Sequence, residues 1–302
     1  MRDLLIIGSG PAGITAGIFA ARRNLKTLII SDPSELSLAE EATIIDDWPG
    51  DPGINGIELV KKFRDHAKKL GVELVEEKVT GIEKSGSCFR VSTKKNGYEG
   101  KTIIFATGAK HRKGLVRGED RLSGKGVSYC ASCDAPLYRG KKVMVLGGGD
   151  TAASSALLLE QVGVDTTLVH RRDELRAAEA WGNKLKKSKV NILWDTVCLE
   201  IRGKERVGSA VLFNKKTKKK EEVPVDGVFV AFGTIPTSEI ARKAGVRVSE
   251  NGYIIVDRNQ KTNIECIFAA GDCCDNPSKK IVTASGDGAI ATESAYHYIR
   301  KN

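Results

Sequence analysis

The stretch Cys130-Ala131-Ser132-Cys133-Asp134 stands shortly before Gly147-Gly148-Gly149-Asp150-Thr151-Ala152. Two cysteines separated by two residues can close a small disulfide that opens and closes as a two-electron switch. Such a motif often lowers the pKa of one thiol. Asp134 follows the pair directly and is placed to donate or accept a proton. A CxxC motif beside a βαβ unit is typical of a redox site, so the rest of the chain is expected to supply and remove electrons.

Two other interpretations of the cysteine pair are weaker. A structural metal site needs another ligand pair, but Cys273 and Cys274 are adjacent and no His completes a familiar zinc pattern. A purely structural disulfide closes a tiny loop and gives little entropic stabilisation. We therefore expect a redox pair and no metal site. Of the other cysteines, Cys273 and Cys274 are expected to be two free thiols, and three more are expected to be small core residues: Cys88, Cys198 and Cys266.

The composition indicates a globular protein of two domains. The chain has 302 residues, 41% hydrophobic and 28% charged, with a formal net charge of +10. Seven cysteines form no even framework, which favours a reducing compartment. Glycines interrupt the apolar run at the N-terminus, and no stretch reaches the length of a membrane span. We therefore expect a cytoplasmic protein that binds no membrane.

One dense group of lysines lies at positions 215–220, between two strand-like runs at 211–213 and 222–225. This placement predicts the solvated tip of a hairpin. A nucleic-acid surface would need basic residues interleaved with aromatics or a known reader fold, and the sequence has neither. Nucleic acid is therefore not an expected partner. The positive charge is expected to steer acidic partners or anionic cofactors toward the surface.

The N-terminus predicts a strand, a glycine turn and a helix. Residues 4–7 form a short apolar run typical of a buried parallel strand. A G-x-G-x-x-G turn follows, a helix continues over 14–23, and 26–30 is the next strand. In this motif the glycines allow a tight turn and close approach to a pyrophosphate, and an acid some twenty residues on holds a ribose. The residues of this site are Gly8, Gly10, Pro11, Ala12, Gly13 and Asp32.

A second unit of the same kind begins at Lys142. Residues 143–146 predict a strand, a G-x-G-x-x-A turn opens a helix to about residue 162, and 165–169 predict the following strand. Arginines stand where an acid would select a free 2′-hydroxyl, and a guanidinium pairs well with a 2′-phosphate. The pattern favours NADPH over NADH. The candidate residues are Gly147, Gly149, Asp150, Thr151, Ala152, His170, Arg171, Arg172 and Arg176.

Between the two fingerprints we expect a helix at 54–70 and strands at 72–75, 79–83, 89–92 and 102–106. The last strand ends in Thr107-Gly108, which is placed to meet a cofactor or forms a plain β-turn.

Together these motifs resemble low-molecular-weight thioredoxin reductases, flavoproteins of the pyridine nucleotide-disulfide oxidoreductase family. The resemblance covers nearly the whole chain. Besides the cysteine pair and both glycine turns, it includes Ala106-Thr107-Gly108, His170-Arg171-Arg172-Asp173-Glu174-Leu175-Arg176-Ala177 and Ala269-Ala270-Gly271-Asp272.

The resemblance implies an α/β fold with two Rossmann-like dinucleotide-binding domains. An FAD domain would comprise residues 1–113 and 244–302, with Thr107, Gly108, Gly271 and Asp272 at the flavin. An inserted NADPH domain, 116–241, would carry the CxxC motif. Linkers are expected near 112–118 and 240–246, with a fresh turn and strand at 251–256 and a final helix at 283–299.

The mechanism implied by the resemblance runs from NADPH to FAD to the Cys130–Cys133 disulfide. Cys133 would be the sulfur nearer the flavin, Cys130 would attack the substrate disulfide, and Asp134 would handle the proton. The substrate would be thioredoxin or a glutaredoxin-like protein, the domains would rotate between two states, and the enzyme would be a homodimer.

The chain departs from the family pattern at three places. It lacks the usual Gly-Gly-Gln after the second strand (here residues 32–38) and the usual Arg-Gln-Ala before the last helix (here Lys279-Lys280-Ile281). Ser154-Ser155 replace a common glutamate pair. Two alternatives on the same frame are a ferredoxin-linked reductase and a flavin-dependent dithiol oxidase. A non-enzymatic flavin-binding scaffold is a third, which the intact CxxC disfavours.

Overall fold

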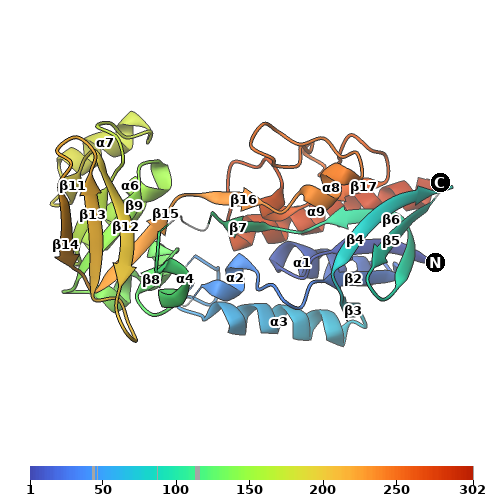
Figure 1. Cartoon of the computed structure of the whole chain (residues 1–302). Coiled ribbons are helices and arrows are strands. Elements are labelled where there is room, and N and C mark those ends of the chain that lie inside the picture. The colour runs from blue at the N-terminus through green and yellow to red at the C-terminus, as the bar shows by residue number, and fades with distance from the viewer. Residues whose placement is uncertain (43–44, 46, 87, 113–115, 302) are drawn as a thin grey trace. The chain divides into compact units, whose positions relative to one another are not determined.

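The structure is a computed structural model that describes residues 1–302 except 43–44, 46, 87, 113–115 and 302. The chain folds into two compact units (Figure 1). The flanking unit comprises residues 1–42, 47–110 and 235–302, and the inserted unit is built mainly from residues 111–234. The predicted α/β class, with one discontinuous unit and a second unit inserted into it, is confirmed.

The flanking unit is organised around a seven-stranded sheet in the order β3-β2-β1-β6-β5-β4, with β17 also paired to β6. β1, β2, β3, β6 and β17 run parallel where they pair, and β4 and β5 add an antiparallel hairpin. The strands are β1 (Arg2–Ile7), β2 (Thr27–Ser31), β3 (Glu73–Glu76), β4 (Val79–Ser85), β5 (Cys88–Thr93), β6 (Gly97–Phe105) and β17 (Ile267–Ala269). The four strands expected between residues 72 and 106 are all present.

Two helices from opposite ends of the chain cover one face of this sheet. α1 (Pro11–Arg22) and α9 (Ile281–Lys301) share a core cluster with β1 and β6 and lie side by side in Figure 1. Their close approach depends on small residues. Thr292 Oγ1 of α9 donates to the carbonyl of Ala16 at 3.1 Å. A second cluster fills the opposite face and includes α8 (Glu239–Lys243).

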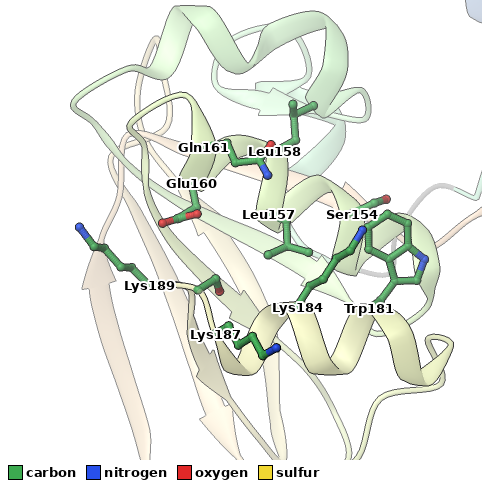
Figure 2. Close-up of a pocket in the computed structure, with 10 residues that line it drawn as sticks. Ser154, Leu157, Leu158, Glu160, Gln161, Trp181, Lys184, Lys187 and Lys189 are labelled. Atoms are coloured by element: carbon green, nitrogen blue, oxygen red, sulfur yellow. The ribbon is translucent and has the colours of Figure 1, made fainter.

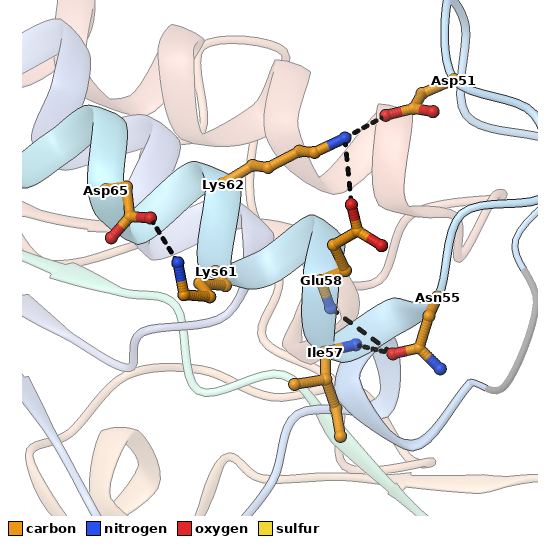
Figure 3. A network of polar contacts seen from close by, with 7 residues as sticks. All are labelled: Asp51, Asn55, Ile57, Glu58, Lys61, Lys62 and Asp65. Atoms are coloured by element: carbon orange, nitrogen blue, oxygen red, sulfur yellow. Dashed lines mark hydrogen bonds and ion pairs between the residues drawn. The ribbon is translucent and has the colours of Figure 1, made fainter.

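α3 (Gly56–Lys69) packs its apolar face on α1, as the spacing of its apolar residues predicts. Figure 3 shows how the helix begins: Asn55 Oδ1 accepts hydrogen bonds from the backbone N–H groups of Ile57 and Glu58. On the exposed face, Lys62 pairs with Asp51 and Glu58. A short helix that the sequence analysis missed, α2 (Leu38–Glu41), precedes it and starts with a Ser37–Glu40 capping box.

The inserted unit has a five-stranded parallel sheet in the order β11-β10-β9-β15-β8. A three-stranded antiparallel sheet, β12-β13-β14, packs on one face through a shared apolar cluster. The strands are β8 (Val127–Ser128), β9 (Lys142–Gly147), β10 (Asp165–Val169), β11 (Asn191–Leu193), β12 (Thr196–Arg202), β13 (Ser209–Asn214), β14 (Lys220–Pro224) and β15 (Gly227–Ala231). The lysine-rich segment lies between β13 and β14, which confirms the predicted hairpin.

Helices cover the other face of the parallel sheet. α5 (Ala131–Asp134), the 3₁₀ turn Ala135–Tyr138, α6 (Asp150–Gln161) and α7 (Glu179–Lys186) all contribute to one cluster with β9, β10 and β15. A further short helix, α4 (Glu119–Leu122), precedes β8.

The two passages between the units pair with each other. β7 (Ala109–His111) and β16 (Thr234–Pro236) form a two-stranded sheet. The second passage is therefore earlier than the expected segment 240–246 and the expected boundary at 241–244. The reason is packing: α8 belongs to the flanking unit, where Ala241 and Val246 are buried in the core. The expected first boundary at 113–116 falls largely on residues outside the described part.

Two smaller expectations also differ. The segment 251–256 forms no regular strand, because Ile254 makes only isolated bridges to Val248 and Cys274. Within the described residues, no helix is both long and apolar enough to cross a membrane.

We predict that Gly288→Ala destabilises the protein by about 2 kcal/mol through overpacking. A Cβ at Gly288 would lie 2.2 Å from the carbonyl oxygen of Ala12, so α9 would have to move away from α1. Gly286→Ala is the matched control on the same helix, because its Cβ would meet no atom within 4 Å. Thermal unfolding should show a lower Tm for the first variant, and an equal or higher Tm for the second. Equal Tm values for both variants would contradict the packing argument.

Candidate redox and nucleotide-binding site

In the inserted unit, Cys130 and Cys133 form a disulfide across α5, with Cα atoms 5.3 Å apart. Cys130 is the N-cap residue of α5 and is half-buried, whereas Cys133 is buried. The Ser128 hydroxyl accepts a hydrogen bond from the Cys130 N–H at 3.1 Å, and the Asp134 N–H donates to the Cys130 carbonyl. Of the two linked residues, Cys130 is therefore the more exposed and Cys133 the more buried.

The Asp134 carboxylate lies beside this pair. Its Oδ1 atom is buried and accepts no hydrogen bond from any residue that the structure describes. Burial raises the pKa of Tyr138, one turn further along the chain, and the charge of Asp134 raises it further. Asp134 Oδ1 is therefore open to a hydrogen bond from a donor that approaches the cysteine pair.

The second glycine turn connects β9 to α6, as predicted. Gly147 has φ +159°, and a Cβ there would lie 2.6 Å from the Ala231 carbonyl oxygen. A Cβ at Gly148 would lie 2.1 Å from ring atoms of His170. A Cβ at Gly149 would meet no atom within 4 Å. The turn is therefore tight on its protein side and open at the residue that begins α6, where a helix N-terminus favours an anion.

The segment 170–178, which we name the arginine loop, is fastened to this turn. His170 Nδ1 lies 2.9 Å from the Gly147 carbonyl oxygen, and the Arg176 N–H donates to the Gly148 carbonyl at 2.7 Å. Asp150 Oδ1 accepts from the Ala178 N–H at 2.7 Å. These contacts fix the loop beside the start of α6. The bracing role of His170 was not foreseen, because sequence spacing does not show which way a ring packs.

Within the arginine loop, His170 differs from the arginines. Its ring is buried, and burial lowers its pKa, with the nearby Arg172 and Arg171 acting in the same direction. Arg171, Arg172 and Arg176 are exposed. The three guanidinium groups are thus available to an anion next to the glycine turn, and His170 supports the turn from within.

In the flanking unit, the first glycine turn connects β1 to α1. Gly8 has φ +110°, and a Cβ there would lie 2.2 Å from the Ala106 carbonyl oxygen. A Cβ at Gly13 would lie 1.9 Å from the carbonyl oxygen of Gly8 itself. Gly10 begins α1 without any side-chain cap, Pro11 is in the first turn, and no acidic residue is there. The N–H groups at this helix start can therefore bind a phosphate.

A profile of the pyridine nucleotide-disulphide oxidoreductase family matches residues 2–288 of the chain. The chain belongs to this family. It is 37% identical to a thioredoxin reductase of Treponema pallidum over 302 residues, which covers 98% of this chain and 97% of that protein. It is similar in structure to a thioredoxin reductase of Streptococcus pyogenes, with TM-score 0.86 and 39% identity over 100% and 99% of the two chains. A ferredoxin-flavin thioredoxin reductase of Clostridium acetobutylicum matches with TM-score 0.54 and 33% identity over 100% and 99%.

Several of the residues predicted for the first nucleotide site lie beside its glycine turn. Gly271, at φ +79°, approaches α1 so closely that a Cβ would lie 2.9 Å from the Ala12 Cβ. Thr107 Oγ1 donates to the Thr237 carbonyl, and the Gly108 carbonyl accepts from the Thr237 N–H at 2.9 Å. The Thr107-Gly108 segment is therefore an anchored turn.

Asp32 follows the end of β2 and is already engaged by protein groups. It accepts hydrogen bonds from the Ser34 hydroxyl and N–H and forms an ion pair with Lys78 at 3.0 Å. Ser34 and then Lys78 lower the pKa of Asp32 to about 2. The carboxylate is thus ionised at neutral pH, which a hydrogen bond to ribose hydroxyls requires. Ser9 and Ser31 also join at 2.7 Å and tie the turn to β2.

Asp272 and Asp287 form a carboxylate pair near the start of α9. Asp287, which the sequence analysis missed, accepts hydrogen bonds from the Gly271 N–H, the Asn276 amide and the Gln260 amide. Burial raises the pKa of Asp287, and burial raises the pKa of Asp272 to about 6, with Asp287 adding to it and Lys279 opposing it. The acidic side chain of Asp287 stands among small residues of the last helix, but its partners lie in separate segments that the sequence does not connect.

Cys273 and Cys274 follow directly and are two free, fully buried thiols with sulfurs 3.9 Å apart, as expected. Cys273 contacts the Ala270 and Phe105 carbonyl oxygens. Cys88, Cys198 and Cys266 are half-buried and outside any disulfide, and the last two pack against core clusters. Among the described residues, no group of three or more His, Cys, Asp or Glu could hold a metal ion.

We predict that Asp272→Asn stabilises the protein above pH 6 but not at pH 4. Because burial raises the folded-state pKa of this acid, the folded state binds the proton more tightly than the unfolded chain. Wild-type stability therefore falls as pH rises from about 4 to 6, by about 3 kcal/mol at most, and the Asn variant lacks this loss. Urea unfolding between pH 4 and 8 measures it, with the exposed Asp275→Asn as the control. A constant difference across this range would contradict the assignment.

Proposed function

We propose that this chain is an NADPH-dependent flavoprotein that reduces the disulfide of thioredoxin. The observation that carries the proposal is the Cys130–Cys133 disulfide in the unit that contains the second glycine turn. Full-length relatives that are thioredoxin reductases support it. The reaction transfers two electrons and opens one protein disulfide while a second disulfide forms at Cys130 and Cys133.

The residues of the flanking unit fit FAD. Gly8, Gly10 and Gly13 leave the start of α1 open to a pyrophosphate, with Pro11 and Ala12 shaping the first turn. Asp32, ionised beside Ser34, would accept from the adenosine ribose. Thr107, Gly108, Gly271 and Asp272 would line the rest of the site. When bound, FAD supplies the means of passing an electron pair between a nicotinamide and a disulfide.

The residues of the inserted unit fit NADPH. Gly147, Gly149, Thr151 and Ala152 form the turn and the start of α6, and Asp150 holds the arginine loop through Ala178. The exposed Arg171, Arg172 and Arg176 would pair with the 2′-phosphate, and His170 holds the turn in place.

The two sulfurs have different tasks. Cys130, half-buried at the N-cap of α5, is the sulfur that a protein disulfide can reach, so it attacks that disulfide as a thiolate. Cys133 is buried and closes the ring again by attacking Cys130 in the mixed disulfide, which releases the reduced partner. Asp134, which lies beside the pair with one carboxylate oxygen unengaged, would handle the proton of the exchange.

We propose that the enzyme works in the cytoplasm. Five cysteines outside the Cys130–Cys133 disulfide support a reducing compartment. A glutaredoxin-like protein is a second candidate partner, and a homodimer is the proposed assembly. The similarity to a ferredoxin-flavin thioredoxin reductase makes ferredoxin the alternative electron donor. The arginines beside the second glycine turn favour NADPH.

We predict anaerobic turnover with NADPH and a thioredoxin from the same organism, and its loss to background in Cys133→Ser. Without Cys133 the mixed disulfide between Cys130 and the partner cannot be resolved, and there is no Cys130–Cys133 disulfide for the flavin to reduce. Nicotinamide oxidation at catalytic enzyme concentration measures the reaction. Cys88→Ser, at a half-buried cysteine outside the disulfide, is the control and should keep full activity. If thioredoxin stays oxidised while the flavin bleaches, the partner is wrong. If neither nicotinamide bleaches the flavin, ferredoxin becomes the donor to test.

We also predict that the double variant Arg171→Ala and Arg172→Ala raises the KM for NADPH about tenfold or more. The KM for NADH should hardly change, because NADH lacks the 2′-phosphate that these guanidinium groups would bind. Lys215→Ala with Lys216→Ala is the matched control, since it removes the same charge from the same unit at the hairpin tip. Equal rises for both nucleotides would overturn the NADPH assignment.

A further inference from the structure

A groove of about 680 Å³ lies between α6 and α7 in the inserted unit. Leu157 and Leu158 of α6 and Trp181 of α7 supply its apolar lining. Figure 2 shows Leu157 between the two helices, with Trp181 and Lys184 directed toward α6 and Ser154. Its size is within the range of pockets that bind a specific ligand or side chain.

Three lysines surround this apolar lining: Lys184, Lys187 and Lys189. All three are exposed, and none pairs with a carboxylate within the described chain. Lys184 Nζ instead lies 4.6 Å from the centre of the Trp181 ring. Glu160, on the α6 side, is the one acidic residue of the described lining. The groove thus combines apolar contact area with unneutralised positive charge.

The charge of the whole inserted segment points the same way. Residues 111–234 contain 23 Lys and Arg against 15 Asp and Glu, a formal charge of +8 out of the +10 of the chain. A partner with acidic residues would therefore be drawn to this unit in particular. An apolar groove with a lysine rim complements an apolar side chain flanked by carboxylates.

The groove and the redox pair lie on the same side of the five-stranded sheet. Ala131 and Ala135, next to the cysteines, belong to the same apolar cluster as Leu157 and Leu185. α6 packs against α5 and against α7. A folded protein that reaches Cys130 can therefore extend along α6 to the groove.

From these observations we infer that the α6–α7 groove is a docking site for the disulfide-bearing protein partner. The partner would insert an apolar side chain between Leu158 and Trp181 and place flanking carboxylates against Lys184, Lys187 and Lys189. This inference rests on the proposed function, because it names the protein that Cys130 attacks as the occupant. It adds a contact that selects acidic partners without taking part in the electron transfer.

The test is the triple variant Lys184→Glu, Lys187→Glu and Lys189→Glu in the full-length flavin-loaded enzyme, with the cognate thioredoxin as the probe. We expect the KM for thioredoxin to rise about tenfold at low salt, with kcat little changed. The rate at which NADPH bleaches the flavin should be unaffected, since no nucleotide site is touched. Raising the ionic strength should weaken the wild type more than the variant.

The matched control is Lys215→Glu, Lys216→Glu and Lys218→Glu, which makes the same charge change at the hairpin tip of the same unit. Its KM should rise much less than that of the groove variant. An equal rise in the KM of both variants would show a diffuse charge effect and would overturn the proposal that the groove is a docking site. An unchanged KM in the groove variant would also overturn it, while turnover by the wild type keeps the proposed function. Absence of wild-type turnover with thioredoxin would instead reject the proposed function together with its occupant.

Discussion

At the start of α1, a Cβ on Gly13 would lie 1.9 Å from the carbonyl oxygen of Gly8, a separation that no other residue type can accept. This contact sets how near the helix lies to β1, and much of the flanking unit follows from it. Gly271 can approach Ala12, and α9 can lie against α1 through Gly288, because α1 is held close and is made of small residues. The close approach of α1 to β1 at Gly8 and Gly13 thus determines both the shape of the nucleotide turn and the packing around it.

In the inserted unit, the glycine turn between β9 and α6 is also closely packed, and at Gly148 it meets a side chain rather than a backbone carbonyl. Its turn is limited by the His170 ring, which occupies the place where a Cβ of Gly148 would be. Because the ring comes from the end of β10, the arginine loop cannot move independently of the turn. Backbone hydrogen bonds from Arg176 and Ala177 to the Gly148 carbonyl therefore position the end of the loop.

Secondary structure can be predicted from the sequence where a local pattern of residues has a single physical explanation. Apolar runs next to glycine turns predict β1, α1, β9 and α6, and these elements are present within one to three residues. The CxxC spacing is short enough to predict its own disulfide. Prediction fails where tertiary packing decides. α2 depends on a capping box within a polar segment, α8 is too short for a periodic signal, and the second passage pairs with β7, more than a hundred residues away in the sequence. The same holds for Asp287, whose partners come from three separate segments.

Asp32 follows the second strand of the flanking unit, and His170 follows the second strand of the inserted unit. The two residues illustrate how one fold can serve two ligands. In the flanking unit, Ser34 and Lys78 keep Asp32 ionised, so a negative acceptor remains at the end of β2. In the inserted unit, burial keeps His170 neutral and turns it inward, so the groups left at the surface are the positive arginines. The backbone frame is similar in both, and the sign of the exposed charge is opposite. A ligand with an extra phosphate would be favoured at the second site and disfavoured at the first. This difference in exposed charge supports the proposal that the two units hold different cofactors.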